Sequence, residues 1–193
     1  VEFPEIDHIV FAGMGGSGSI GSIFSSILSQ TNIHVSVVKG YLLPKTVDSQ
    51  TLVVTTSISG NTIETLTVLK KAKEENCKII GFSSGGKMEQ YCFKNKIDFR
   101  KIPQMHSPRA SFTGFLYSML KILGPNIPKK ELDILGSIEQ LKILGEKINS
   151  KNISCENPAI DLANWITDIP QIYYPSGLEA AAIRFKNSLH ENA

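Results

Sequence analysis

Two hydrophobic patterns alternate along the first 124 residues. Short runs rich in Val and Ile are typical of strands buried on both faces of a parallel sheet. Between them, apolar residues recur every three or four positions, as they do in helices. The predicted strands are residues 6–12, 33–38, 51–56, 78–83 and 97–102, and the predicted helices are residues 17–30, 62–76, 86–94 and 110–123. This order predicts an α/β fold with a flavodoxin-like, doubly wound sheet of five parallel strands, whose ligands bind at the carboxyl ends of the strands.

The pattern changes after Gly124-Pro125. Apolar residues at helical spacing predict one amphipathic helix over residues 129–149. A predicted strand at 169–174 and a predicted helix at 178–189 then repeat the strand–turn–helix order, and one such unit cannot bury a core alone. We therefore expect that the chain is truncated, or that the remainder of this unit packs from elsewhere. The expected regions are a first domain over 1–124, a helical linker over 125–156, and the beginning of a second α/β domain over 157–193.

Composition excludes several classes of function. The net charge is +2 and Lys and Arg are not clustered, so electrostatics give little support for nucleic-acid binding. No apolar run approaches the roughly 18 residues that a membrane span needs. The chain begins without the basic and apolar segments of a signal peptide, and without Met, so we expect the natural chain to begin earlier. Its three cysteines lack metal-like spacing and are expected to be buried thiols of a cytoplasmic protein.

Three hydroxyl side chains mark the turn after the third predicted strand. Ser57, Ser59 and Thr62 lie where that strand ends and the next helix begins. First-turn amides of a helix lack intrahelical partners and carry partial positive charge, so this turn suits a phosphate ester. The alternative is an ordinary helix cap, but a cap needs only one hydroxyl and this turn has three. Asn61, three residues before Glu64, also predicts a capping box.

A glycine-rich turn follows the first predicted strand. Its sequence, Gly13-Met14-Gly15-Gly16-Ser17-Gly18, formally contains the dinucleotide-binding pattern G-x-G-x-x-G. That site also needs an acidic residue at the end of the second strand, where this chain has Lys39. The nucleotide P-loop pattern is missing as well. A tight turn without a ligand is the alternative, and we favour a second anion-binding loop.

Four further side chains have open interpretations. Lys87, after the fourth strand, is more simply solvated than a ligand contact. Arg109 precedes a predicted helix, where an oxyanion-stabilising role and a surface role are equally supported. From pattern alone Glu191 is solvated, and adjacent His190 cannot face it on a helix. The histidines show no metal spacing, so no metal site is expected.

Several segments, in this order, resemble the sugar isomerase (SIS) domain family, in particular its branch of bifunctional phosphoglucose/phosphomannose isomerases. They are the glycine-rich turn at 13–18, Ser57 to Thr65, Ser83 to Lys87, Pro108-Arg109-Ala110-Ser111 and Glu191-Asn192-Ala193. The serine–threonine turn marks the wider family, and the last two segments mark the branch. The resemblance implies two SIS domains and a homodimer, and this chain would span the first domain and the start of the second.

The resemblance also implies the residue roles. Gly16, Ser17, Ser57, Ser59 and Thr62 would hold the 6-phosphate of the sugar substrate. Arg109 would stabilise a cis-enediolate, and Glu191 would move the proton between C1 and C2 while glucose 6-phosphate or mannose 6-phosphate interconverts with fructose 6-phosphate. No cofactor or metal is implied.

Two departures and two alternatives accompany the resemblance. The branch usually has Asn at the position of His190, and its ring-opening His and a further active-site Lys would lie beyond residue 193. The 193 residues alone are therefore not expected to complete a normal catalytic cycle. A non-catalytic sugar-phosphate sensor is the first alternative, although no DNA- or partner-binding segment is visible. Another SIS enzyme, such as a ketose-phosphate isomerase or an amino-sugar deglycase, is the second.

Overall fold

The computed structural model describes residues 6–107, 109–124 and 131–190. The chain forms two compact units, which are described separately. The first comprises residues 1–128 together with 174–193, and the second comprises residues 129–173. The domain boundaries expected at residues 124 and 156 stay predictions.

A five-stranded sheet is the centre of the first unit. Its strands are β1 (His8–Ala12), β2 (His34–Val38), β3 (Thr51–Ser57), β4 (Lys78–Ser83) and β5 (Asp98–Lys101). All neighbouring pairs are parallel, and the order is β2-β1-β3-β4-β5. This order confirms the predicted flavodoxin-like fold. The strand order reverses between β1 and β3, which is where such folds bind ligands.

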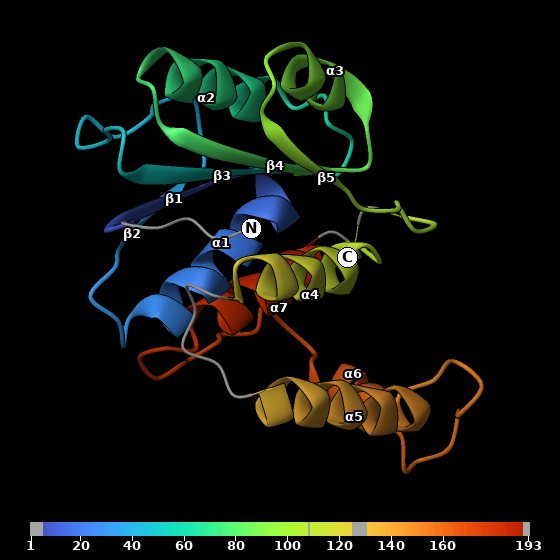
Figure 1. Cartoon of the computed structure of the whole chain (residues 1–193). Coiled ribbons are helices and arrows are strands. Elements are labelled where there is room, and N and C mark those ends of the chain that lie inside the picture. Colours follow the sequence, from blue (N-terminus) through green and yellow to red (C-terminus); the bar gives the residue numbers. More distant parts are fainter. Residues whose placement is uncertain (1–5, 108, 125–130, 191–193) are drawn as a thin grey trace. The chain divides into compact units, whose positions relative to one another are not determined.

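Helices cover both faces of the sheet (Figure 1). Helices α2 (Ile63–Glu74) and α3 (Gly86–Lys94) lie on one face, and α1 (Gly15–Leu28) and α4 (Phe112–Ile122) lie on the other. Each face has its own apolar core; Phe24 and Phe115 are fully buried in the one beneath α1 and α4. Full burial of such a side chain contributes about 1.5–3 kcal/mol to folding. The four predicted helices of this region are confirmed, with ends that differ by a few residues.

Helix α7 (Glu179–His190) packs against α1 in the same unit, although about 150 residues separate them in sequence. Its residue Ala180 is 3% exposed. The helix predicted at 178–189 is therefore confirmed, and it supplies one wall of the site described below.

The strand predicted at residues 169–174 is wrong. This segment is irregular, and Ile169 and Tyr173 are largely exposed. Pro170 has no amide hydrogen to donate, and the segment is paired with no strand of the described residues. Alternating apolar residues form a strand only where a neighbouring strand accepts their hydrogen bonds.

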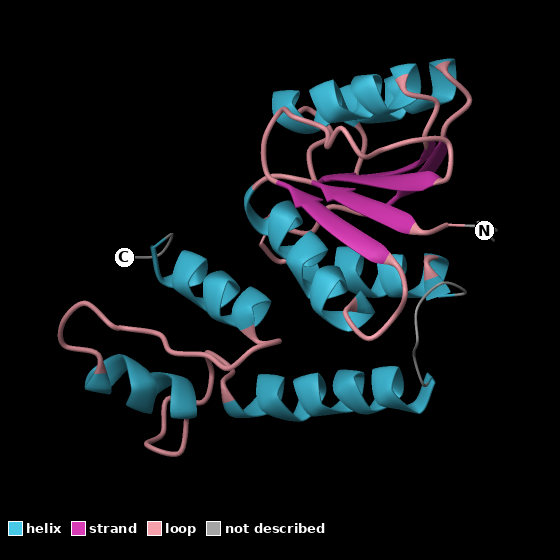
Figure 2. Cartoon of the chain, turned by 90° about the vertical axis from the view of Figure 1, so that its left-hand side faces the viewer, coloured by secondary structure: helices cyan, strands magenta, loops and turns pink. Residues whose placement is uncertain are grey.

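The second unit holds two described helices, α5 (Glu131–Lys147) and α6 (Pro158–Trp165) (Figure 2). The amphipathic helix predicted at 129–149 is confirmed as α5. Helix α6 was not predicted, although its start signal was present: Asn157 accepts a hydrogen bond from the amide of Ala159 at 3.0 Å, and Pro158 occupies the first turn.

The three cysteines differ in environment. Cys92 is buried and Cys77 is half-buried, and desolvation raises the pKa of each thiol to about 11. Both thiols are therefore protonated at neutral pH. Cys155 is exposed, so the expectation that all three are buried is wrong for this residue.

The histidine and acidic side chains form no metal site among the described residues. His8 is buried and shares a hydrogen bond of 3.0 Å with Ser36. Among the described residues, no group of three or more His, Cys, Asp or Glu side chains could hold a metal ion. Within the same ranges, no helix combines the length and apolar character required to cross a membrane.

Candidate functional site

A cavity of about 620 Å³ lies in the first unit, bordered by the turns that follow β1 and β3. Four segments line it: the β1–α1 turn, the β3–α2 turn, the approach to α4, and α7. The described lining residues are Met14, Gly16, Ser17, Ile58, Ser59, Thr62, Ser107, Arg109, Phe112 and Arg184. The two predicted anion-binding turns thus border one cavity, and their role in binding an anion stays a prediction.

The β1–α1 turn presents a helix start without a side-chain cap. Met14 is the N-cap residue of α1 and makes no side-chain cap hydrogen bond, and the first turn of α1 contains no acidic residue. Gly13 lies so close to β3 that a Cβ atom would come within 2.9 Å of the carbonyl oxygen of Thr56. This close approach holds the positive end of α1 beside the second turn, an arrangement that suits an anion.

The three hydroxyls of the β3–α2 turn have different positions. Ser59 and Thr62 line the cavity, whereas Ser57 is 2% exposed and does not. Instead, the Ser57 hydroxyl shares a hydrogen bond of 2.9 Å with the Thr62 hydroxyl and accepts one of 3.1 Å from the Gly60 amide. Ser57 thus stabilises the turn on which Ser59 and Thr62 line the cavity.

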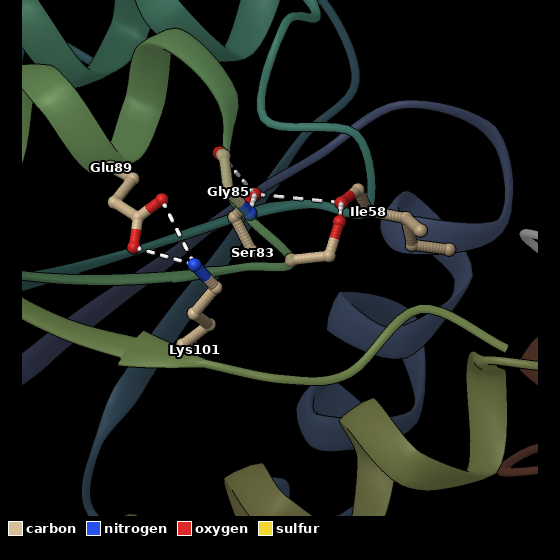
Figure 3. Close-up of polar contacts among 6 residues, drawn as sticks. Ile58, Ser83, Gly85, Glu89 and Lys101 are labelled. Carbon is tan, nitrogen blue, oxygen red and sulfur yellow. Dashed lines mark hydrogen bonds and ion pairs between the residues drawn. The ribbon is translucent and has the colours of Figure 1, made fainter.

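The β4–α3 turn supports the β3–α2 turn from behind (Figure 3). The Ser84 hydroxyl donates to the carbonyl oxygen of Ile58 at 2.5 Å, and the Ser83 hydroxyl oxygen lies 3.5 Å from the same carbonyl oxygen. Ser83 also donates to the carbonyl oxygen of Gly85 at 2.9 Å and accepts from its amide at 3.1 Å. Ser83, Ser84 and Gly85 are not among the described residues that line the cavity.

Asn61 joins the two turns instead of capping its own helix. Thr62 is the N-cap residue of α2, and the Asn61 side-chain oxygen accepts a hydrogen bond of 3.1 Å from the Lys87 amide in the first turn of α3. The predicted capping box of Asn61 and Glu64 is therefore wrong, because the neighbouring helix start uses the same acceptor. The Lys87 side chain is exposed, as its solvated interpretation predicted.

Gly60 allows this close contact. Its φ is +67°, which side-chain-bearing residues rarely adopt, and an added Cβ would overlap the carbonyl oxygen of Gly85. The β3–α2 and β4–α3 turns therefore form one rigid layer, and only the first of them faces the cavity.

Arg109 lies in the turn that precedes α4. Its side chain lines the cavity, and its carbonyl oxygen accepts a hydrogen bond of 3.2 Å from the amide of Phe112. The Ser107 hydroxyl accepts from the amide of Ala110 at 3.3 Å and so helps to shape this turn. A place in the cavity fits the oxyanion-stabilising interpretation of Arg109, and that chemical role stays a prediction.

Arg184, on α7, was not predicted. Its guanidinium carbon lies 4.8 Å from the centroid of the Phe112 ring, and a Cβ added to Gly16 would lie 3.3 Å from one guanidinium nitrogen. Nothing in the sequence could have found it, because the pattern around it placed α7 in another domain. Glu191 lies outside the described residues, which end with α7 at His190. Pro108 is also outside them.

The electrostatics of the cavity favour an anion. Its described lining contains two arginines and no Asp or Glu. The starts of α1 and α2 add partial positive charge. A site of about 620 Å³ with this lining is large enough for a phosphorylated sugar.

Comparisons with known proteins agree on one family. The model of the SIS domain matches residues 2–122. The bifunctional phosphoglucose/phosphomannose isomerase of Caldicellulosiruptor bescii is 35% identical over 201 residues, which cover 100% of this chain and 58% of that protein. The D-glucosamine-6-phosphate 4-epimerase of Sulfolobus acidocaldarius is 31% identical over 188 residues, covering 97% of this chain and 58% of that one. The chain thus spans less than two thirds of these relatives.

A solved structure shows the same fold. The tagatose-6-phosphate ketose/aldose isomerase from Escherichia coli superimposes with a TM-score of 0.64 at 18% identity, over 94% of this chain and 52% of that one.

Proposed function

This chain belongs to the SIS domain family, and we propose that it carries the phosphate-binding part of an aldose–ketose isomerase that acts on hexose 6-phosphates. The observation that carries the proposal is the cavity in which two uncapped helix starts and two arginines converge. The relatives named as phosphoglucose/phosphomannose isomerases support this substrate class.

The phosphate would lie between the two turns. Amides at Gly16 and Ser17 and the hydroxyls of Ser59 and Thr62 would donate hydrogen bonds to its oxygens, and Ser57 would hold Thr62 in place. The phosphate is remote from C1 and C2 of the sugar. Its binding energy would therefore serve to position the reacting carbons.

The proposed reaction is a proton transfer. A base removes the proton from C2 of open-chain glucose 6-phosphate or mannose 6-phosphate, and the electron pair forms a cis-enediolate with the negative charge on O1. The C2 hydroxyl proton passes to O1, and the base returns its proton to C1 to give fructose 6-phosphate. We assign the base to Glu191, and a positioned general base typically contributes about 10²–10⁴-fold. Arg109 would stabilise the enediolate oxygen, because a guanidinium offers a positive charge and several N–H donors. A homodimer in the cytoplasm stays a prediction.

Coupled assays of the full-length protein with both aldose 6-phosphates test the proposal. We expect Glu191→Gln to lower kcat by at least about 10²-fold while sugar-phosphate binding is retained. Glu179→Gln is the matched control, because Glu179 is an exposed carboxylate on α7 that does not line the cavity. A Glu191→Gln variant that keeps most of its rate would show that the base is another group.

A second candidate follows from the similarity to a D-glucosamine-6-phosphate 4-epimerase. Both reactions need a phosphate site, so the cavity alone does not separate them. Incubation of the full-length protein with glucosamine 6-phosphate, followed by NMR analysis of the sugar products, separates them. Formation of the C4 epimer without aldose–ketose turnover would favour the epimerase. Binding of sugar phosphates without any product would favour a sensor.

A further inference from the structure

We propose that Arg184 binds the substrate phosphate directly and makes the site selective for the dianionic form of a phosphate monoester. This inference deepens the proposed function and rests on it. Neither the sequence motifs nor the roles implied by the resemblance include Arg184. Its position in the cavity is the starting point.

Arg184 reaches the same helix start that would hold the phosphate. One of its guanidinium nitrogens lies 3.3 Å from the point where a Cβ of Gly16 would be, so the missing side chain at Gly16 leaves room for the arginine. Gly16 is in the first turn of α1, which carries partial positive charge. A cation beside the positive end of a helix is electrostatically unfavourable unless an anion lies between them. The arrangement is therefore suited to a bound anion.

Phe112 orients the guanidinium. The guanidinium carbon lies 4.8 Å from the ring centroid, within the range of a cation–π contact. A guanidinium that contacts a ring in this way can still donate N–H hydrogen bonds in its own plane. A planar pair of donors fits two oxygens of a phosphate group better than a lysine ammonium does.

The two arginines of the cavity differ in their setting. Arg184 projects from a regular helix and is half-buried, whereas Arg109 belongs to a turn and is exposed. Charge interactions strengthen as water is excluded. We therefore assign the phosphate to Arg184 and leave Arg109 for the reacting end of the sugar.

Within the part of the chain that the structure describes, no acidic side chain pairs with Arg184. No ion pair of the described residues involves Arg184, and the described cavity lining contains no Asp or Glu. A ligand that carries two negative charges would complete the site. Phosphate monoesters reach this state above a second pKa of about 6.

The test compares two charge-removing variants on α7. Arg184→Met removes the guanidinium and retains an apolar chain that can pack on Phe112, and Lys186→Met removes an exposed charge that does not line the cavity. Calorimetric titration of the full-length protein with glucose 6-phosphate should give a Kd about 10- to 100-fold higher for Arg184→Met. Lys186→Met should change the Kd by less than about twofold, since exposed charges contribute little. Arg184→Lys should give an intermediate Kd, because it keeps the charge but loses the planar pair of donors.

The pH dependence separates ligand contact from packing. Between pH 5.5 and 7.5 the affinity of the parent protein should rise as the phosphate loses its second proton, and this rise should be much smaller in Arg184→Met. Equal thermal midpoints of the variants would show that α7 remains packed. An unchanged Kd and pH profile in Arg184→Met, in a parent that prefers glucose 6-phosphate to glucose, would overturn the role of Arg184 alone. A parent that binds both sugars equally would overturn the phosphate site itself.

Discussion

Two turns of similar composition, at the carboxyl ends of adjacent parallel strands, have different tasks. The β3–α2 turn, Ile58 to Thr62, lines the cavity, and the β4–α3 turn, Ser83 to Lys87, is absent from its described lining. Both contain serine and glycine. In the first turn, Ser59 faces the cavity, while in the second the serine hydroxyls bind backbone carbonyls.

The difference shows that a serine–glycine turn is not by itself a ligand site. What separates the two turns is the neighbour that each one faces. The first lies next to the switch in strand order between β1 and β3, where a second helix start is close. The second packs against the first and makes it rigid. Four substitutions test this division.

Gly60→Ala should separate the two turns and have the largest effect. A Cβ there would overlap the carbonyl oxygen of Gly85, and the residue would keep a strained positive φ. We expect a loss of about 3 kcal/mol or more in the free energy of unfolding, together with weaker sugar-phosphate binding. Urea denaturation and calorimetric titration measure the two effects. Gly40→Ala is the control, because a Cβ at Gly40 has no neighbour within 4 Å. Equal stability of both variants would contradict the tight contact between the turns.

Ser83→Ala should reduce stability more than ligand binding. Ser83 is 0% exposed, and its hydroxyl bonds to both the amide and the carbonyl oxygen of Gly85. Leaving these buried groups without a partner should cost about 1–3 kcal/mol. Chemical denaturation measures this loss, and the affinity for glucose 6-phosphate should fall by less than about threefold at a temperature where the variant is folded. A large loss of affinity without a loss of stability would place Ser83 at the ligand.

Ser59→Ala should reduce ligand binding more than stability. Ser59 is exposed in the cavity, so its replacement should leave the free energy of unfolding within about 0.5 kcal/mol. The Kd for glucose 6-phosphate should rise about tenfold, which corresponds to one lost hydrogen bond to a charged group. Titration with unphosphorylated glucose is the control and should not distinguish the variant from the parent. If both ligands are affected equally, Ser59 does not contact the phosphate.

Glu89→Gln should have the smallest effect, although its contact is conspicuous in Figure 3. Lys101 lies 3.0 Å from a Glu89 carboxylate oxygen, but the Lys101 side chain is 63% exposed. Water and salt weaken such pairs, so the free energy of unfolding should change by less than about 1 kcal/mol. Denaturation at low and high salt measures the change. A larger loss would indicate that the outer side of the β4–α3 region also stabilises the turns.

The sequence predicted the fold well for a physical reason. Buried parallel strands such as β3 need continuous apolar and β-branched residues, and this pattern is visible without any knowledge of partners. The segment at 169–174 has a similar pattern but forms no strand. Pairing depends on what lies beside a segment, and a local pattern carries no information about that.

The same limit applies to the candidate site. Short-range motifs identified the turns around Gly16 and Ser59, and the structure places both at one cavity. They did not reveal that Ser57 supports the turn from within, or that Asn61 binds the next helix start. Arg184 was missed because its approach to Gly16 joins segments far apart in the chain.

The packing of α7 on α1 has a consequence for synthesis of the protein on the ribosome. The N-terminal turns leave the ribosome long before Arg184 does; at elongation rates of about 5–20 residues per second, the delay after Thr62 is roughly 6 to 24 s. During this interval the growing chain can form the sheet and both turns but lacks the wall that α7 provides. Sugar phosphates in the cell should therefore stabilise the finished chain much more than the nascent one.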